Sequence, residues 1–323
     1  MPLSEVELID RYFRALGARR PDVELGVGDD AAVLVVPPGK RLVAAADALV
    51  DAIHFPHGTS ARSVGHRALA VNLSDMAAMG ATPAWAILTL TLPEADEVWL
   101  AEFAAGLGKL ACEHGVALVG GDTTAGPLTV SLTILGLAAS GAYLTRAGAA
   151  PGDHVFVSGT PGDAAAGLAI LESRLAGGSD AAREELRRRF LFPQPRVELG
   201  ERLVGIASAA IDVSDGLAGD LEKLARASRC GARIDVDELP LSPALIECAG
   251  RAAARDFALA GGDDYELCFS VPAARLGLLA DRVPDARWPR RQIGILTDSG
   301  QIEYHSSDPQ FRPSAGGYDH FVR

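Results

Sequence analysis

Residues 26–33 read Gly26-Val27-Gly28-Asp29-Asp30-Ala31-Ala32-Val33, a glycine-rich stretch with two adjacent aspartates. Its spacing matches the G-x-G-x-x-A fingerprint of a dinucleotide site, which requires a strand before it and a helix after it. Here the aspartates are followed by a strand-like apolar run, so we reject that interpretation. The chain also contains no G-x-x-x-x-G-K-[ST] phosphate-binding loop. A fold built on either glycine-rich motif is therefore not expected.

Strands and helices are expected in irregular order on both sides of this stretch. Ser4 and Glu7 have the spacing of a capping box, which predicts a helix that runs to about Leu16 and stops at Gly17. By apolar periodicity we expect further helices at 60–79 and 94–113, and strands at 31–36, 41–46, 85–92, 116–119 and 128–139. The turn-rich segment 140–152 predicts a boundary between a domain of residues 1–140 and a domain of residues 141–323.

The second half repeats this mixture of elements. We expect strands at 154–158, 209–213, 265–271 and 292–296, a helix that is opened by residues 159–163 and runs through 171, a helix at 217–227, and an exposed helical excursion between 173 and 189. Neither half shows the strict alternation of strand and helix that characterises a doubly wound sheet. The sequence therefore predicts two domains of mixed α/β and α+β structure.

Seven aspartates stand beside glycine or in apolar surroundings, where a carboxylate needs a partner. They are Asp29, Asp30, Asp47, Asp75, Asp122, Asp212 and Asp215. Few basic residues lie near them in sequence, and sites made of oxygen ligands suit Mg²⁺, which is commonly shared with substrate phosphates. A turn remains an alternative role for Asp29, Asp30 and Asp122. The recurrence of this setting favours an enzyme that uses a magnesium nucleotide.

Bulk composition excludes several classes of protein. The net charge of −12 and the pI near 5.0 provide no basic surface for nucleic acid. The four cysteines lack Cys-x-x-Cys spacing, the N-terminus carries acidic residues where a signal peptide carries positive charge, and no apolar run reaches the roughly 18 residues that span a membrane. We expect a soluble cytoplasmic protein.

Histidine and serine offer little for nucleophilic catalysis. His54 is the histidine beside an acidic cluster, either as a functional group or as a satisfied, partly buried side chain, and no G-x-S-x-G elbow occurs. A base is not required if the acceptor is a phosphate, since its second pKa is about 6 and its oxygen is already anionic at neutral pH. Catalysis then consists of positioning and charge neutralisation.

Motifs along nearly the whole chain resemble those of the thiamine-monophosphate kinase family. They include Gly-Asp-Asp-Ala-Ala-Val from residue 28, Val-Asn-Leu-Ser-Asp from 71, Gly-Gly-Asp-Thr-Thr from 120, Ile-Asp-Val-Ser-Asp-Gly-Leu from 211 and Gly-Gly-Asp-Asp-Tyr-Glu-Leu from 261. The resemblance implies the two-domain aminoimidazole ribonucleotide synthetase-like fold, whose N-terminal domain dimerises through its strands. It also implies an ATP-dependent kinase that converts thiamine monophosphate to thiamine diphosphate.

The resemblance further implies roles for individual residues. Mg²⁺ ligands would be Asp30, Asp47, Asp75, Asp122, Asp212 and Asp215, with the carbonyl of Ala46 as a further donor. Of these, Asp30, Asp75, Asp122 and Asp212 would be catalytic. ATP would contact Gly121, Asp122, Arg146 and Ser214, and thiamine monophosphate would contact His54, Asp263 and Tyr318.

Three departures from the family pattern concern these sites. Ala45 and Ala46 replace hydroxyl residues before Asp47, Asp263 stands where Glu is frequent, and Ala125 stands where Arg is frequent. Within the same superfamily, a selenophosphate synthetase would need a reactive Cys near the N-terminus, but the first Cys is Cys112. A hydrogenase-maturation dehydratase would end in Cys, but this chain ends Phe-Val-Arg. A non-enzymatic metal- or nucleotide-binding regulator is the alternative from another class.

Overall fold

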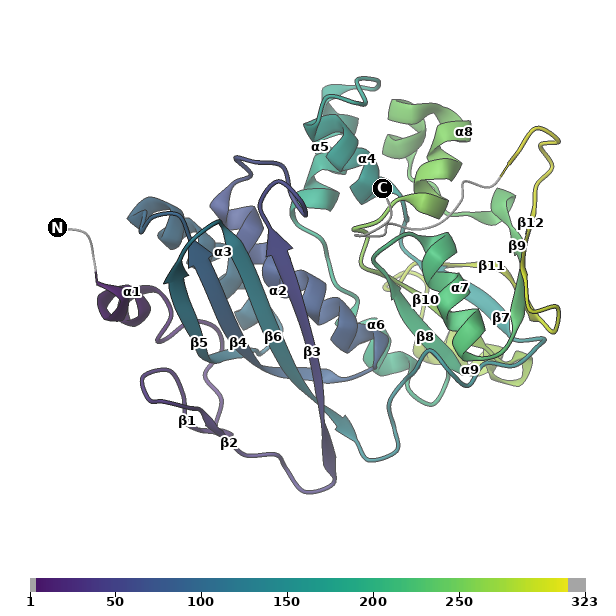
Figure 1. The fold of residues 1–323 in the computed structure, drawn as a ribbon. Coiled ribbons are helices and arrows are strands. Elements are labelled where there is room, and N and C mark those ends of the chain that lie inside the picture. The colour runs from purple at the N-terminus through teal and green to yellow at the C-terminus, as the bar shows by residue number, and fades with distance from the viewer. Residues whose placement is uncertain (1–3, 313–323) are drawn as a thin grey trace. The chain divides into compact units, whose positions relative to one another are not determined.

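The computed structural model describes residues 4–312 of the chain, which divides into two compact units (Figure 1). The first unit comprises the residues up to 76 together with 81–141, and the second comprises 77–80 together with the residues from 142 onward. Each unit has its own sheet and its own core, so each is described by itself.

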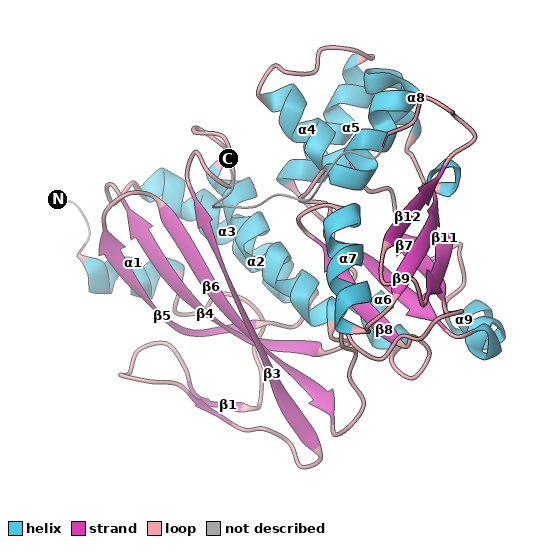
Figure 2. Cartoon of the chain, turned by 45° about the vertical axis from the view of Figure 1, so that its right-hand side comes forward, coloured by secondary structure: helices cyan, strands magenta, loops and turns pink. Residues whose placement is uncertain are grey.

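The N-terminal unit is built around a four-stranded sheet with strand order β3-β6-β4-β5 in its described part. Its elements are α1 (Glu5–Tyr12), β1 (Val23–Leu25), β2 (Val33–Leu34), β3 (Lys40–Val50), α2 (Ala61–Ala78), β4 (Thr82–Leu92), α3 (Glu97–Glu113), β5 (Ala117–Ala125) and β6 (Thr129–Ala139). β4 and β5 are parallel and are joined through α3, whereas the other pairs are antiparallel. Helices α2 and α3 cover one face of this sheet (Figure 2).

Alternation along the strands separates the two faces of this sheet. Leu88 and Leu90 of β4 are buried on the helix-covered face, whereas Ile87, which precedes Leu88, is 37% exposed, and Thr89 between the two leucines is also exposed. On edge strand β3, Leu42 is 50% exposed. Because side chains alternate between faces, one face forms the core and the other presents apolar residues outward.

The C-terminal unit contains a six-stranded sheet with order β12-β9-β11-β7-β10-β8 in its described part. Its elements are β7 (His154–Ser158), α4 (Asp163–Leu171), α5 (Asp180–Leu191), α6 (Val197–Leu203), β8 (Ala209–Val213), α7 (Leu217–Ala227), β9 (Gly231–Asp235), α8 (Pro243–Ala260), β10 (Glu266–Val271), α9 (Leu276–Arg282), β11 (Arg290–Thr297) and β12 (Ile302–His305). A core of β-branched and leucine side chains from the strands and α7 fills the space between them. Helices α4, α5 and α8 share a second core.

The predicted class of mixed α/β and α+β structure is confirmed, and most predicted elements are present. The capping box forms as predicted, since Ser4 Oγ accepts from the Glu7 N–H and the Glu7 carboxylate accepts from the Ser4 N–H. The predicted end of that helix at Leu16 is wrong, because α1 ends at Tyr12. The strand predicted at 31–36 shrinks to Val33–Leu34.

Two further differences affect the interpretation of the site. The strand predicted to end at 119 continues to Ala125, so Asp122 lies within β5 and not in a turn. The segment 173–189 is not a wholly exposed excursion, because α5 buries Ala182 and Leu186 in the core that it shares with α4 and α8. Both errors arise from tertiary contacts that periodicity alone does not reveal.

Candidate active site

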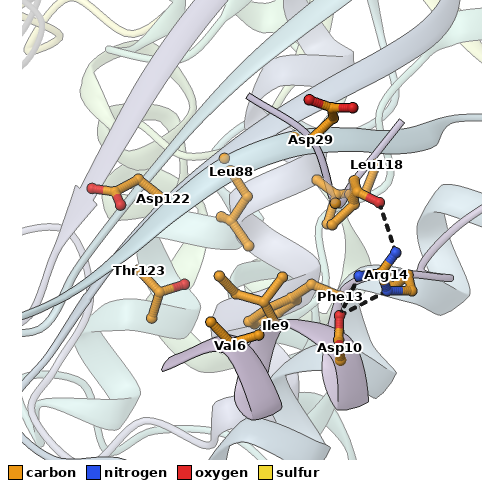
Figure 3. A pocket seen from close by; sticks show the side chains of 14 residues that line it. Val6, Ile9, Asp10, Phe13, Arg14, Asp29, Leu88, Leu118, Asp122 and Thr123 are labelled. Atoms are coloured by element: carbon orange, nitrogen blue, oxygen red, sulfur yellow. Dashed lines mark hydrogen bonds and ion pairs between the residues drawn. The ribbon is translucent and has the colours of Figure 1, made fainter. Parts of the chain in front are cut away.

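A cavity of about 270 Å³ lies within the N-terminal unit, between α1, the 27–29 loop and the parallel strands β4 and β5 (Figure 3). Its apolar wall consists of Val6, Ile9, Phe13, Leu88 and Leu118. Its polar wall consists of Asp10, Arg14, Gly28, Asp29 and the run Gly120-Gly121-Asp122-Thr123. The cavity therefore brings together the Gly-Asp-Asp and Gly-Gly-Asp-Thr-Thr motifs, which are about 90 residues apart in sequence.

Glycine is needed at position 121 by close packing between strands. A Cβ built on Gly121 would lie 1.8 Å from the Leu88 carbonyl oxygen, its direct partner across the β4–β5 pair. Without a side chain there, the two strands approach closely and the backbone of residues 120–123 forms the cavity wall. Asp122 follows immediately and is exposed. A ligand at this wall would meet backbone groups beside a carboxylate.

The loop on the opposite side of the cavity is held by local hydrogen bonds. Asp29 Oδ1 accepts from the N–H of the next residue, Asp30, at 2.8 Å, whereas an Asx turn would use the N–H two residues on. Arg14 pairs with Asp10 one helical turn earlier and also donates to the Val27 carbonyl at 3.3 Å. Asp30 itself is exposed and is not among the residues that line the cavity.

The other predicted residues of this unit lie outside the cavity lining. Asp47 and Ala46 are in edge strand β3, where they pair with Leu132 and Thr133 of β6. The row Asp47–Leu132–Leu88–Gly121 crosses the sheet, so Asp47 lies three strand spacings, about 14 Å, from Gly121. Within this unit, a single Mg²⁺ therefore cannot contact both Asp47 and the backbone at Gly121.

His54 precedes helix α2, and Asp75 lies in the last turn of that helix. Asp75 is half-buried near the C-terminal end of the helix. His54 lies in the turn before the helix, where its Nδ1 accepts from the Val50 N–H at 3.0 Å. Because Nδ1 is an acceptor, neutral His54 carries its hydrogen on Nε2, and that nitrogen is a hydrogen-bond donor.

In the C-terminal unit, Ser214 and Asp215 form a turn that connects β8 to α7. The buried carboxylate of Asp220 fixes this turn by accepting from the N–H groups of Ser214 and Asp215 at 2.9 and 3.0 Å. Burial raises the pKa of Asp220, while the Lys223 ammonium at 2.8 Å opposes that change. Lys223 also contacts Asp215 Oδ2 at 2.5 Å. Asp215 thus already has a cationic partner.

The loop 261–265 packs against the same turn. The Asp263 N–H donates to the Ser214 carbonyl and the Tyr265 N–H donates to the Val213 carbonyl, both at 2.8 Å. The structure therefore brings together Ser214, Asp215 and Asp263, three of the predicted site residues. Asp212 is buried in β8, where it pairs with Leu267, and Arg146 is exposed in the segment before β7. Tyr318 lies outside the described residues.

Behind this loop is a fully buried carboxylate with several partners. Glu266 accepts from Ser158 at 2.5 Å, from Arg196 at 2.5 and 2.6 Å, and from Arg189 at 2.7 Å. Burial by itself would raise the pKa of Glu266, but the two guanidinium groups outweigh it and lower the pKa to about 2. Glu266 is therefore an anion with saturated hydrogen bonding.

The donor chemistry of the chain fits a hard divalent cation, although no ready-made cage is present. In residues 4–312, no three His, Cys, Asp or Glu side chains converge as a metal cluster. Asn72, one helical turn before Asp75, has a buried Oδ1 without a hydrogen-bond partner, and such an oxygen suits a hard cation. Sites that bind Mg²⁺ with few protein ligands and shared phosphate oxygens need no such cage.

Sequence reasoning missed the buried residues that hold the loops of the predicted site in place. Asp220, Lys223, Asp264 and Glu266 were not singled out, and neither was the α1 face that lines the cavity. A signal was available for Asp220, because a carboxylate in the first turn of a helix commonly binds backbone N–H groups. The partners of Glu266 are 70 and 77 residues away, and no local pattern indicates them.

Comparisons with known proteins cover nearly the whole chain. The model of the AIR synthase related protein N-terminal domain matches residues 28–138, and that of the C-terminal domain matches residues 150–302. Thiamine-monophosphate kinase of Salmonella typhimurium is 45% identical over 323 residues, covering 100% of this chain and 99% of the relative.

Solved structures give the same result. A thiamine-monophosphate kinase from Stenotrophomonas maltophilia is 47% identical, with a TM-score of 0.84 over 88% of this chain and 92% of that one. AaThiL complexed with AMPPCP and TMP is 32% identical, with a TM-score of 0.76 over 91% of this chain and 92% of that one.

Proposed function

The chain belongs to the AIR synthase related family and, within it, to the thiamine-monophosphate kinases, and we propose that it transfers the γ-phosphoryl group of ATP to thiamine monophosphate. The products are ADP and thiamine diphosphate, so the reaction is the last step in making thiamine diphosphate. The observation that carries this proposal is the likeness to AaThiL, a protein that binds AMPPCP and TMP together. A nucleotide analogue and a phosphorylated acceptor on one protein are what a kinase requires.

The nucleotide is proposed to contact the wall formed by Gly121 and Asp122, with Arg146 and Ser214 as further contacts. In support, the β4–β5 packing leaves the backbone at 120–123 without a covering side chain. An arginine is suited to bidentate pairing with phosphate oxygens. His54, Asp263 and Tyr318 are proposed to contact thiamine monophosphate.

The aspartates are proposed to hold Mg²⁺ when the substrates bind. The ligands would be Asp30, Asp47, Asp75, Asp122, Asp212 and Asp215, with the Ala46 carbonyl as an additional oxygen donor. β3 is an edge strand, so alternate residues direct their carbonyls away from β6, which is compatible with Ala46 as a donor. Bound Mg²⁺ would neutralise phosphate charge. At Asp215 the metal competes with Lys223.

The protein's own contribution to the reaction is proposed to be positioning without a covalent intermediate. The acceptor phosphate is anionic at neutral pH, so no side chain needs to remove a proton before attack. Direct in-line transfer is sufficient when both substrates are held in register. The four catalytic residues proposed, Asp30, Asp75, Asp122 and Asp212, act as charged ligands and not as nucleophiles.

We also propose that the domain of residues 1–140 carries ATP binding and homodimer contacts, and that residues 141–323 contribute the remaining site residues. The outward face of the four-stranded sheet exposes Leu42 and Ile87, and burying such a face in a second copy is favourable. The acidic charge supports small-molecule substrates over nucleic acid. In residues 4–312, no helix is long and apolar enough to cross a membrane. The four free cysteines and the use of ATP support a cytoplasmic location.

A coupled assay of ADP release tests the proposed function. The full chain should release ADP in the presence of ATP, Mg²⁺ and thiamine monophosphate, and should not do so with thiamine or an aminoimidazole ribonucleotide precursor. Binding of thiamine monophosphate without turnover would instead support the regulator class. Turnover of an aminoimidazole precursor would place the chain in another branch of the superfamily.

A further inference from the structure

The loop 261–265 contains two non-glycine residues in the left-handed region of backbone space. Asp263 has φ of +67° and Tyr265 has φ of +52°. This conformation is uncommon for residues other than glycine, and it is retained when surrounding contacts require it. Here Asp263 is the residue proposed to contact thiamine monophosphate, so the strained backbone lies at the substrate contact.

Two sets of hydrogen bonds hold this loop in place. The N–H groups of Asp263 and Tyr265 bind the carbonyls of Ser214 and Val213. Between them, the buried Asp264 carboxylate accepts from the N–H groups of Gly162 and Ala164 at 2.6 and 3.1 Å, at the start of α4. The loop is therefore fixed to two separate elements of the C-terminal unit.

The same conformation brings the side chains of residues 263 and 265 together. The Tyr265 hydroxyl donates to Asp263 Oδ1 at 2.9 Å, and the Tyr265 side chain is buried with the residue only 7% exposed. A hydroxyl bound to a carboxylate is a charge-assisted hydrogen bond, which restricts rotation of the carboxylate. Asp263 is half-buried, so its side chain is partly accessible to solvent while its backbone is held by the hydrogen bonds of the loop.

We propose that Tyr265 is a positioning residue for thiamine monophosphate, acting through Asp263. This inference rests on the proposed function. Asp has one methylene fewer than the Glu that is frequent at position 263 in the family, and a shorter side chain tolerates less error in direction. A carboxylate oriented before the substrate arrives loses less conformational freedom on binding. Tyr265 supplies that orientation without touching the substrate.

The test compares Tyr265→Phe, Asp263→Asn and the double variant in steady-state assays of ADP release. Tyr265→Phe should raise the KM for thiamine monophosphate about three- to tenfold, the effect of one hydrogen bond. The KM for ATP, kcat and Tm should stay near their wild-type values. Because Tyr265 acts through Asp263, the double variant should be no worse than Asp263→Asn alone.

Tyr304→Phe is the matched control, since it removes a partly buried tyrosine hydroxyl of the same unit in β12. It should leave both KM values unchanged. Asp263→Ala removes the carboxylate that accepts the Tyr265 hydrogen bond. It should raise the KM for thiamine monophosphate at least as much as Tyr265→Phe does.

Several outcomes would overturn the inference. They are equal changes in both KM values, a fall in Tm alone, or additive effects in the double variant. An active wild-type protein that Tyr265→Phe leaves unchanged would overturn the inference but not the proposed function. A wild-type protein without turnover of thiamine monophosphate would overturn both.

Discussion

The two halves of the molecule hold their acidic residues in opposite ways. In the N-terminal unit, Asp29 and Asp122 are exposed at the wall of a cavity. In the C-terminal unit, Asp220, Asp264 and Glu266 are at most 4% exposed, and each accepts at least two hydrogen bonds. The first arrangement leaves carboxylates accessible to a ligand, whereas the second uses the hydrogen bonds of buried carboxyl groups to fix backbone and side chains.

This difference separates two roles that look alike in sequence. A buried carboxylate that loses its partners, or its charge, destabilises the fold, because the groups around it remain buried. An exposed carboxylate adds little to stability and is free to act on a ligand. Variants of the two classes should therefore separate loss of activity from loss of stability.

The largest effect is expected from Asp122→Asn in the exposed class. Asparagine keeps the shape but removes the charge that would hold a metal beside phosphate, so kcat should fall at least about 1000-fold, or about 4 kcal/mol. Tm should stay within about 2 °C of wild type, as for exposed substitutions generally. Asp298→Asn, at an exposed turn, is the control and should be fully active. An active Asp122→Asn variant would remove Asp122 from the catalytic set.

Glu266→Gln tests the buried class. Its guanidinium partners, Arg189 and Arg196, would lose their counter-charge inside the fold, which should cost about 3 kcal/mol of unfolding free energy. Glu198→Gln breaks an ion pair with Arg287 at an exposed site and should cost less than about 0.5 kcal/mol. Denaturant unfolding measures both. Equal losses in the two variants would show that burial is not what distinguishes these pairs.

The pH dependence of stability should have opposite signs at two neighbouring acids. The pKa of Glu266 is lowered to about 2 from 4.5, so its contribution to stability is present above about pH 4.5 and is lost as pH falls toward 2, roughly 3 kcal/mol in all. Burial raises the pKa of the Asp264 carboxyl well above its usual range, so the folded state binds a proton there more tightly than the unfolded chain does. The contribution of Asp264 to stability is therefore lost as pH rises from the usual range of an aspartate toward the raised pKa of the folded state.

Unfolding free energies of wild type, Glu266→Gln and Asp264→Asn between pH 3 and 7 measure these slopes. Glu266→Gln should flatten the acid side of the profile, and Asp264→Asn should remove the opposing decline. Parallel profiles for all three proteins would contradict the assigned protonation states.

The smallest effect is expected at Asp215, which lies between the two classes. It is 38% exposed and paired with Lys223. Lys223→Gln removes the competing cation, so the Mg²⁺ concentration for half-maximal rate should fall about two- to fivefold, the usual strength of a partly exposed ion pair. A higher Mg²⁺ requirement would show that Lys223 itself, and not a metal, is the working partner of Asp215.

Sequence patterns singled out Asp29 and Asp122 of the accessible class, but not Asp220, Asp264 and Glu266 of the buried class. Asp122 stood out because glycines precede it, and a close strand approach at Gly121 is a local requirement. Asp212, Ser214 and Asp215 stood out because they end a strand. Glu266 did not, because its partners Arg189 and Arg196 are 77 and 70 residues away and reach it only in the folded unit. The predicted end of a strand at residue 119 was wrong for a related reason, since pairing with β4 extends β5 to Ala125 and excludes the alternative of a turn at Asp122.

We propose that neither class of acid supplies a nucleophile, so that the phosphoryl group passes directly between two bound substrates. Stereochemical analysis of the transfer from ATP with a chiral γ-phosphate to thiamine monophosphate tests this most directly. Direct transfer predicts thiamine diphosphate whose terminal phosphorus is inverted, as a single in-line displacement requires. Net retention would reveal a phosphoenzyme and contradict the account, and so would failure to form thiamine diphosphate at all.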